Sequence, residues 1–213
     1  MEIVRQKAYR KTFQIACEEL ARMPLEEHLK MGGLRFSEKG QSYVIFVPSF
    51  DETIELSIPG FAFSSSRSSN ITLTAKIIIL HYIINASGAP LSRDLVPYED
   101  IPGCRVYAPV FERRVSKPLL TAFGYDRDAF ARAGASLGGK PEEFGDASFT
   151  VNAFPRVPLT FILWEGDQDF PPSIKVLFDR ASQHYLPLED VVVVSKMAAT
   201  RILRQARKEY VDS

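Results

Sequence analysis

The sequence predicts a single α+β domain over residues 1–213, with a small, mostly antiparallel sheet packed against several helices and long amphipathic helices at both termini. Three observations lead to this prediction. Apolar residues recur at helical spacing near both ends of the chain. Short segments rich in β-branched and aromatic residues cluster at 43–58 and 147–178. These segments do not alternate with helices in the manner of a parallel βαβ protein.

The N-terminal region is predicted to contain two helices. The first covers residues 2–23, and its apolar stripe consists of Tyr9, Phe13, Ala16, Cys17 and Leu20. Pro24 interrupts this pattern and can begin a second helix at 24–30. The Gly32–Gly33 pair would end that helix.

A β-hairpin is predicted next. Residues 43–47 (YVIFV) and 53–58 (TIELSI) have the composition of strands, and Pro48, Ser49 and Asp51 lie between them. The polar stretch 61–70 (FAFSSSRSSN) is expected to be a flexible loop.

Residues 71–86 fit two patterns. Apolar and polar residues alternate at first, as in a half-buried strand. The segment nevertheless continues from Asn70, which can act as an N-cap, to Gly88, and this length favours a mostly buried helix.

The middle of the chain is less regular. Residues 89–104 contain three prolines and are expected to form a loop, and residues 105–110 are expected to form a strand. A helix is predicted to start at Ser116, to be split in two at Gly124, and to end at Gly138–Gly139.

The C-terminal third has the clearest pattern. Residues 147–153 alternate, and Pro155 ends that strand. Residues 159–164 (LTFILW) form a continuous apolar run, which is typical of a central strand. The short link from Pro155 to Pro158 favours an antiparallel pair, and 174–178 is a third short apolar segment. A last helix is predicted from Pro187, with one face made of Leu188, Val191, Val192, Ser195, Ala199, Ile202, Leu203, Ala206 and Tyr210.

Composition excludes several classes of protein. The chain has 213 residues, 46% of them hydrophobic, and its 26 basic residues balance its 26 acidic residues. This is not the composition of a disordered, collagen-like or disulfide-framework chain. Zero net charge argues against a nucleic-acid partner, because phosphate binding needs a positive field.

The apolar segments indicate where the protein is located, and the cysteines indicate whether it has a local metal-binding motif. The first residues contain charges and no apolar core of signal-peptide length. The longest apolar run, around 77–84, is shorter than the ~20 residues that span a bilayer. We therefore expect a cytoplasmic protein without a membrane partner. Cys17 and Cys104 belong to no Cys-x-x-Cys pair, so no local motif predicts a zinc or iron–sulfur site, and Cys17 is expected to be a small buried residue.

An acidic turn follows the apolar strand. Glu165, Asp167 and Asp169 could hold a hard cation or supply an acid and a base. The alternative interpretation is a solvated glycine turn in which Asp167 caps backbone amides.

His81 and Tyr82 lie within an apolar segment. A histidine there could be a cofactor ligand, an acid or base, or a hydrogen-bond donor to a ligand. The alternative is a core histidine that is satisfied by a backbone carbonyl. His28 is expected on the surface, and His184 is expected to be structural.

The 105–117 segment is locally basic. Arg105, Arg113, Arg114 and Lys117 outnumber Glu112, whereas residues 140–169 carry six acidic and two basic residues. A phosphate group or an acidic partner could bind the basic segment, although an ordinary solvated face would look the same. Motifs for nucleotide binding and for common hydrolases are missing from the sequence.

Several stretches together resemble a family of bacterial and archaeal proteins called domain of unknown function 3786. They are FPRVPLTFILWEGDQDFPPSIKVLFD (154–179), HYLPLEDV (184–191), ILHYIINASGAPL (79–91), PGCRVYAPVFERR (102–114) and LGGKPEEFGDASF (137–149). The resemblance covers roughly residues 70–213, and 154–191 is its specific part.

The resemblance implies no assigned activity. Members occur mostly in anaerobes, and some look like fusions to a cysteine-rich iron–sulfur module of corrinoid proteins in one-carbon metabolism. This sequence has no such cysteine cluster, so a link to anaerobic redox or corrinoid chemistry rests on analogy alone. The residues in the recognisable blocks that we take as candidate ligand-binding residues are His81, Tyr82, Tyr107, Trp164, Glu165, Asp167, Asp169 and Asp179.

Three functions are compatible with these observations. The first, which we favour, is an accessory module that holds an unknown small molecule or protein partner in an apolar cleft lined by His81, Tyr82, Tyr107 and Trp164. The second is an enzyme that uses the acidic turn together with His81. The third is a structural adaptor that works through the 105–117 patch. The sequence names no cofactor for any of them.

Overall fold

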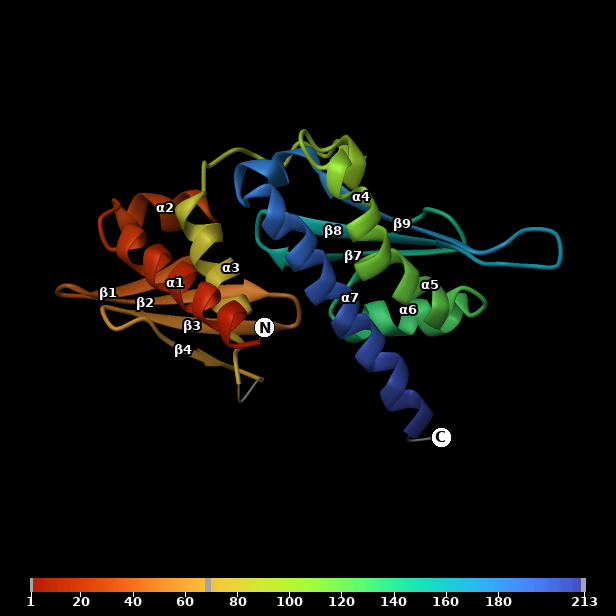
Figure 1. Cartoon of the computed structure of the whole chain (residues 1–213), viewed down its shortest axis with the longest axis horizontal. Helices are drawn as coiled ribbons and strands as arrows, with labels where there is room; N and C mark the ends of the chain where they lie inside the picture. The colour runs from red at the N-terminus through yellow and green to blue at the C-terminus, as the bar shows by residue number, and fades with distance from the viewer. Residues whose placement is uncertain (1, 68–69, 212–213) are drawn as a thin grey trace. The chain divides into compact units, whose positions relative to one another are not determined.

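A computed structural model describes residues 2–67 and 70–211, with side chains over 6–67 and 70–206 (Figure 1). The described residues form helices and two antiparallel sheets, so the α+β prediction is confirmed. The chain divides into two compact units. The first contains residues 1–90, 154–156 and 184–187, and the second contains 91–153, 157–183 and 188–213. A single domain over 1–213 stays a prediction.

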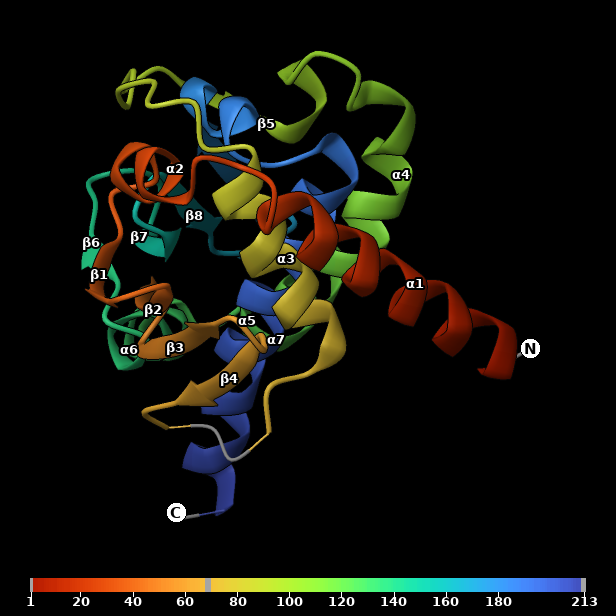
Figure 2. The same ribbon diagram turned by 90° about the vertical axis from the view of Figure 1, so that its left-hand side faces the viewer.

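The first unit combines three helices with a four-stranded sheet. Its elements are α1 (Glu2–Leu20), α2 (Leu25–Met31), β1 (Arg35–Lys39), β2 (Ser42–Ser49), β3 (Glu52–Ile58), β4 (Ala62–Ser65) and α3 (Leu73–Ile84). The strands follow one another in the order β1-β2-β3-β4, as Figure 2 shows. The predicted hairpin is confirmed, and Ile45 of β2 lies opposite Leu56 of β3.

Aromatic contacts join the helices of this unit to its sheet. The Phe13 ring of α1 lies 6.2 Å from the Phe63 ring of β4, and the Lys76 ammonium of α3 lies 5.3 Å from the same ring. Ile45, Val47 and Leu56 are buried because their strands alternate between two faces.

Two local predictions for the first unit are corrected. Residues 61–70 are not simply a loop, because Ala62–Ser65 form β4 and Phe63 pairs opposite Leu56. Residues 68–69 of that stretch lie outside the described residues. The helix chosen for 71–86 is confirmed as α3, but its N-cap is Thr72, whose hydroxyl accepts from the Ala75 amide, and not Asn70.

The second unit holds a five-stranded sheet in the order β5-β9-β8-β7-β6. Its strands are β5 (Leu95–Pro97), β6 (Lys140–Pro141), β7 (Ala147–Phe154), β8 (Val157–Trp164) and β9 (Ser173–Asp179). Its helices and helical turns are η1 (Tyr98–Asp100), η2 (Arg105–Tyr107), α4 (Ala108–Phe111), η3 (Glu112–Ser116), α5 (Lys117–Phe123), α6 (Arg127–Ser136), η4 (Arg180–His184) and α7 (Leu188–Val211). The three C-terminal strands, the split at Gly124 and the last helix are therefore confirmed.

One prediction for the second unit is wrong. Residues 105–110 form the turn η2 and the start of α4 instead of a strand. Pro109 explains the difference, since it cannot donate a ladder hydrogen bond but is well suited to the first turn of a helix. Ser116 does precede α5, but it has helical backbone angles and makes no capping hydrogen bond, because it ends the π-helical turn η3.

None of the described helices is both long and apolar enough to cross a membrane.

Candidate functional site

A pocket lies beside an incomplete edge of the second sheet. β5 pairs only with Leu177–Asp179 of β9, because the chain leaves the sheet at Tyr98 to form η1. Residues 173–176 of β9 therefore have a strand neighbour, β8, on one side only. A hollow of about 440 Å³ is found there. It is lined by Pro97, Tyr98, Glu99, Ala108, Pro109, Phe111, Glu112, Ser116, Ile174, Lys175 and Val176.

The pocket walls are mainly apolar and aromatic. Tyr98 and Phe111 stack with their ring centroids 4.4 Å apart, and Phe111 meets the Phe178 ring edge-on at 6.0 Å. Ile174 and Val176 come from the buried face of β9. Such walls favour an apolar occupant.

Two pocket-lining residues with little exposed surface, Ser116 and Tyr98, carry hydroxyl groups. Ser116 is only 4% exposed, and we find no hydrogen bond to its hydroxyl among the described residues. The Tyr98 hydroxyl is buried without a hydrogen-bond partner of good geometry, although the Cys104 thiol lies close enough to act on it. Burial raises the pKa of Tyr98, and Cys104 adds to that rise. Ser116 can therefore supply a hydrogen bond to an occupant, while Tyr98 supplies a neutral wall.

The pocket mouth carries charged side chains. Glu99, Glu112 and Lys175 are exposed, and no ion pair of theirs is found among the described residues. The helical run that follows Glu112 adds the exposed residues Arg113, Arg114 and Lys117. These three residues are not part of the lining, whose own charged members, two acids and one base, sum to −1.

The acidic turn is held by its own hydrogen bonds. The Asp167 carboxylate accepts from the Asp169 and Phe170 amides at 2.8 and 2.7 Å. The Glu165 carboxylate accepts from the Arg127 amide at 3.0 Å, and its second oxygen lies 3.9 Å from the Arg127 guanidinium. This geometry fits the amide-capping interpretation of Asp167. Within the described residues, no three His, Cys, Asp or Glu side chains gather in a group that could hold a metal ion.

Trp164 and three aromatic residues that were not candidates from the sequence are exposed in the second unit. Trp164 is 38% exposed, whereas Phe144, Tyr125 and Phe170 are 43%, 70% and 72% exposed. Phe170 lies in the long β8–β9 loop, which projects well beyond the strands in Figure 1. The sequence does contain a signal for it, since Phe170 precedes Pro171 and Pro172 in an otherwise polar loop.

Asp179 has a structural set of partners. Its carboxylate accepts from the Ser92 amide and hydroxyl, the Arg93 amide and the Ala181 amide at 2.7–3.0 Å. Burial by itself would raise the pKa of Asp179, but these hydrogen bonds outweigh it and lower the pKa below its ordinary value. With its acceptor positions filled, Asp179 anchors the 92–93 loop to the end of β9.

His81 and Tyr82 belong to the first unit. Tyr82 is fully buried, and its hydroxyl donates to the Gly32 carbonyl at 2.6 Å and accepts from the Arg156 amide at 3.2 Å. Its ring stacks on Phe154 with 4.5 Å between centroids. His81 is half-buried in the last turn of α3.

His28 differs from its expected surface position. It is half-buried, and its Nδ1 lies 3.2 Å from the Ile83 carbonyl oxygen.

The eight candidate residues therefore lie in different parts of the structure. Trp164, Glu165, Asp167 and Asp169 share one end of β8, and Tyr107 directly precedes the pocket-lining helix α4. The common cleft with His81 and Tyr82, and the acid–base pairing of His81 with the turn, stay predictions.

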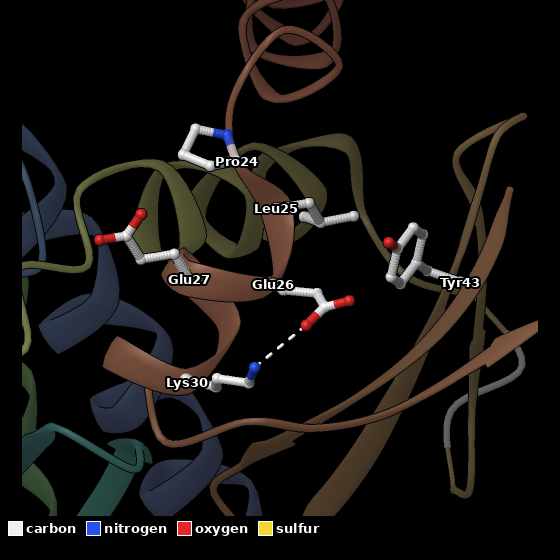
Figure 3. A pocket seen from close by; sticks show the side chains of 6 residues that line it. All are labelled: Pro24, Leu25, Glu26, Glu27, Lys30 and Tyr43. Atoms are coloured by element: carbon white, nitrogen blue, oxygen red, sulfur yellow. Dashed lines mark hydrogen bonds and ion pairs between the residues drawn. The ribbon is translucent and has the colours of Figure 1, made fainter.

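A second hollow, of about 500 Å³, lies in the first unit (Figure 3). Pro24, Leu25, Glu26, Glu27, Lys30 and Tyr43 line it. Its central charges are paired, because the Lys30 ammonium donates to Glu26 at 3.0 Å, and this contact with Lys30 lowers the pKa of Glu26. The Tyr43 hydroxyl donates to Glu38. This hollow therefore offers fewer free groups than the pocket beside β9.

The fold and the pocket define a two-unit α+β protein with antiparallel sheets and a partly open apolar site. Residues 25–201 match the model of the family described as domain of unknown function 3786 (DUF3786). The match covers most of the chain, so the protein belongs to this family. No curated protein and no solved structure shows a significant match.

Proposed function

We propose that this chain is a partner-binding module, and that the pocket beside β9 receives an apolar side chain of the partner. One observation carries the proposal: a pocket with mainly apolar lining residues lies at an incomplete sheet edge. Sheet edges bind extended segments through main-chain hydrogen bonds, and neighbouring pockets select their side chains.

The other proposals receive less support from the contacts. Two carboxylates of the acidic turn, Glu165 and Asp167, already accept backbone hydrogen bonds, which leaves fewer free groups for acid–base chemistry. The adaptor proposal rests on the basic residues Arg113, Arg114 and Lys117, which follow the pocket-lining Glu112 in the sequence, so the two proposals involve neighbouring segments of the chain. The analogy to corrinoid or redox metabolism adds no residue to either.

The test uses N-acetyl-4-fluorophenylalanine amide as a neutral aromatic probe, observed by ¹⁹F NMR. We expect its signal to shift and saturate as the full chain is added. Ser116→Leu fills the pocket and Lys175→Trp covers its mouth, so each should weaken binding at least about tenfold, the equivalent of about 1.4 kcal/mol.

Ser136→Leu is the matched control, because Ser136 is exposed on α6 and away from the pocket lining. Circular dichroism establishes that each variant is folded. Equal binding to the wild-type chain and to a folded Lys175→Trp variant contradicts the proposal.

A further inference from the structure

We propose that another surface of the second unit binds an arginine-rich segment of a partner protein. This surface, which we call the aromatic–acidic surface, consists of residues 124–128, 142–146 and 164–172. None of these residues lines the pocket beside β9, so the inference goes beyond the proposed function. Three observations support it: the three segments are joined at one end of β8, they expose four aromatic side chains, and they carry a large negative charge.

Hydrogen bonds join the three segments at the end of β8. The Gly166 amide donates to the Gly124 carbonyl at 2.9 Å. The Asp146 amide donates to the Leu163 carbonyl at 2.9 Å, and the Glu165 amide donates to the Asp146 carboxylate at 2.8 Å. In Figure 1 the β8–β9 loop and the link between α5 and α6 lie at the same end of the second unit. Segments that are distant in sequence are therefore side by side here.

Two of the exposed rings project from a well-fixed backbone. A Cβ atom at Gly166 would lie 2.5 Å from the Tyr125 ring and 2.6 Å from Pro172, so the missing side chain leaves room for that ring. The Phe170 amide donates to the Asp167 carboxylate at 2.7 Å, and the Phe170 carbonyl accepts from the Asp167 amide at 2.9 Å. Both rings are nevertheless at least 70% exposed. Binding there costs less conformational entropy than binding to a loose loop.

The four exposed aromatic side chains have free faces. They are Trp164, Phe144, Tyr125 and Phe170, and among the described residues none of them makes a ring–ring or cation–π contact. Aromatic faces attract cations, and tryptophan does so most strongly. These rings can therefore bind cationic side chains of a partner.

The same segments are strongly acidic. They contain eight acidic residues and one basic residue, Arg127, which gives a net charge of −7. Including Lys140 and Lys175, the lysines that flank these segments in the sequence, leaves the charge at −5. Backbone hydrogen bonds such as those to Asp167 favour the charged carboxylate and do not neutralise it. Such a surface attracts a cationic segment and repels nucleic acid and other anions.

Aromatic faces and carboxylates together favour arginine over lysine. The guanidinium group is flat, stacks on aromatic rings and can pair with a carboxylate through two parallel N–H groups. The lysine ammonium is a compact, strongly hydrated charge that offers neither stacking nor paired hydrogen bonds. An arginine-rich segment therefore fits both properties of the surface.

The test uses acetyl-hexaarginine amide as the probe. Trp164 is the only tryptophan in the chain, so its fluorescence reports on this surface. We expect the fluorescence of the full chain to change and saturate in about 50 mM salt, and the binding to weaken as salt is added. Calorimetry confirms the dissociation constant. Acetyl-hexalysine amide has the same charge and should bind at least about threefold more weakly.

One pair of variants tests the aromatic rings. The double variant Tyr125→Ser/Phe170→Ser removes two exposed rings and should raise the dissociation constant at least about fivefold. The matched control, Ile15→Ser/Val106→Ser, removes two exposed apolar side chains outside the aromatic–acidic surface. It should bind the probe like wild type.

A second pair of variants tests the charge. Glu143→Lys/Asp169→Lys reverses two exposed charges within the surface and should raise the dissociation constant at least about tenfold. Glu19→Lys/Glu55→Lys changes the net charge of the chain by the same amount, but at exposed positions of the first unit. Its effect should stay within about twofold, because salt screens distant charges.

Several outcomes overturn the proposal. They are a lack of saturable binding, equal binding of the two peptides, or a test variant that is folded by circular dichroism and binds like wild type. Sedimentation velocity adds another: if the wild-type chain self-associates and Tyr125→Ser/Phe170→Ser does not, the surface is a contact between copies of the chain.

The pocket beside β9 is tested separately. Ser116→Leu fills that pocket and should bind acetyl-hexaarginine amide like wild type, because Ser116 lies outside the aromatic–acidic surface. If the fluorinated probe binds the chain but acetyl-hexaarginine amide does not, the proposed function stands and this inference is wrong. The reverse result supports this inference and contradicts the proposed function.

Discussion

At the residue scale, buried polar groups stabilise each of the two units from within. Asp179 and Tyr82 were both candidate ligand-binding residues. Their polar atoms already form hydrogen bonds with nearby backbone groups. Buried polar groups that have partners stabilise a fold modestly, but removing one partner leaves the other unsatisfied at a larger cost. Both residues are therefore expected to affect stability before they affect binding.

Asp179→Asn replaces one carboxylate oxygen with a donor that faces donor amides. We expect the free energy of unfolding at pH 7 to fall by about 1.5–3 kcal/mol. Urea denaturation measures this change. Asp94→Asn is the control, since Asp94 forms an exposed ion pair with Arg180, and its effect should stay below about 1 kcal/mol.

The same residue predicts a pH dependence. The pKa of Asp179 is lower in the folded chain than its ordinary value, which is about 3.9 when unfolded. Its contribution is therefore present above about pH 4 and is lost as the pH falls through the folded-state pKa. Denaturation at several pH values should show a steeper acid loss of stability for wild type than for Asp179→Asn, and parallel curves would contradict this.

Tyr82→Phe leaves the Gly32 carbonyl and the Arg156 amide without their buried partner. We expect a loss of about 1–3 kcal/mol in the free energy of unfolding. Tyr125→Phe should have almost no effect, because Tyr125 is 70% exposed. Equal stability of the two variants in thermal or urea denaturation would show that the Tyr82 hydroxyl does not support the core.

At the element scale, segments with strong local patterns could be predicted, and segments defined by distant partners could not. The hairpin at 43–58 and the strands at 147–164 combine β-rich composition with turn residues, and both formed as expected. β4 is rich in serine and becomes a strand only because β3 lies beside it. Local β-rich composition at 105–110 was overruled by Pro109.

The pocket beside β9 could not be predicted from the sequence for the same reason. The pocket combines residues 97–99 with residues 174–176 and with a π-helical turn, and no local spacing links these segments. The acidic turn could be found because its residues are adjacent in sequence. The Asp167-capped turn was also foreseeable, because aspartate before glycine-rich or polar residues commonly caps backbone amides.

The packing of α6 on β7 depends on Gly134. A Cβ atom at this position would overlap the Phe149 ring. Gly134→Ala should therefore destabilise the chain by about 1–3 kcal/mol, although the same change stabilises an exposed helix by roughly 0.5–1 kcal/mol. Thermal denaturation shows whether Gly134→Ala lowers or raises the stability of the chain. Ser136→Ala, at an exposed position of the same helix, should stay within about 0.5 kcal/mol of wild type.

At the scale of the whole molecule, the chain passes between the two units several times. The first unit consists mainly of residues 1–90, but it also includes 154–156 and 184–187. These two segments supply Phe154 and Tyr185, whose rings stack on Tyr82, and the Arg156 amide that donates to the Tyr82 hydroxyl. The N-terminal unit is therefore incomplete without residues from the C-terminal half.

A fragment of residues 1–90 tests this dependence. It keeps α1–α3 and β1–β4 but lacks both aromatic partners of Tyr82. We expect the fragment to show no cooperative urea transition by circular dichroism, whereas the full chain shows one. A sharp transition in the fragment would mean that the inserted segments are dispensable.

This interleaving has a consequence for how the protein is made. During translation the first unit emerges first, yet its last contributing residue is Pro187, after most of the second unit. Domains that are continuous in sequence can fold in the order of their synthesis. Here the ribosome must release nearly the entire polypeptide before the half that was made first can finish folding.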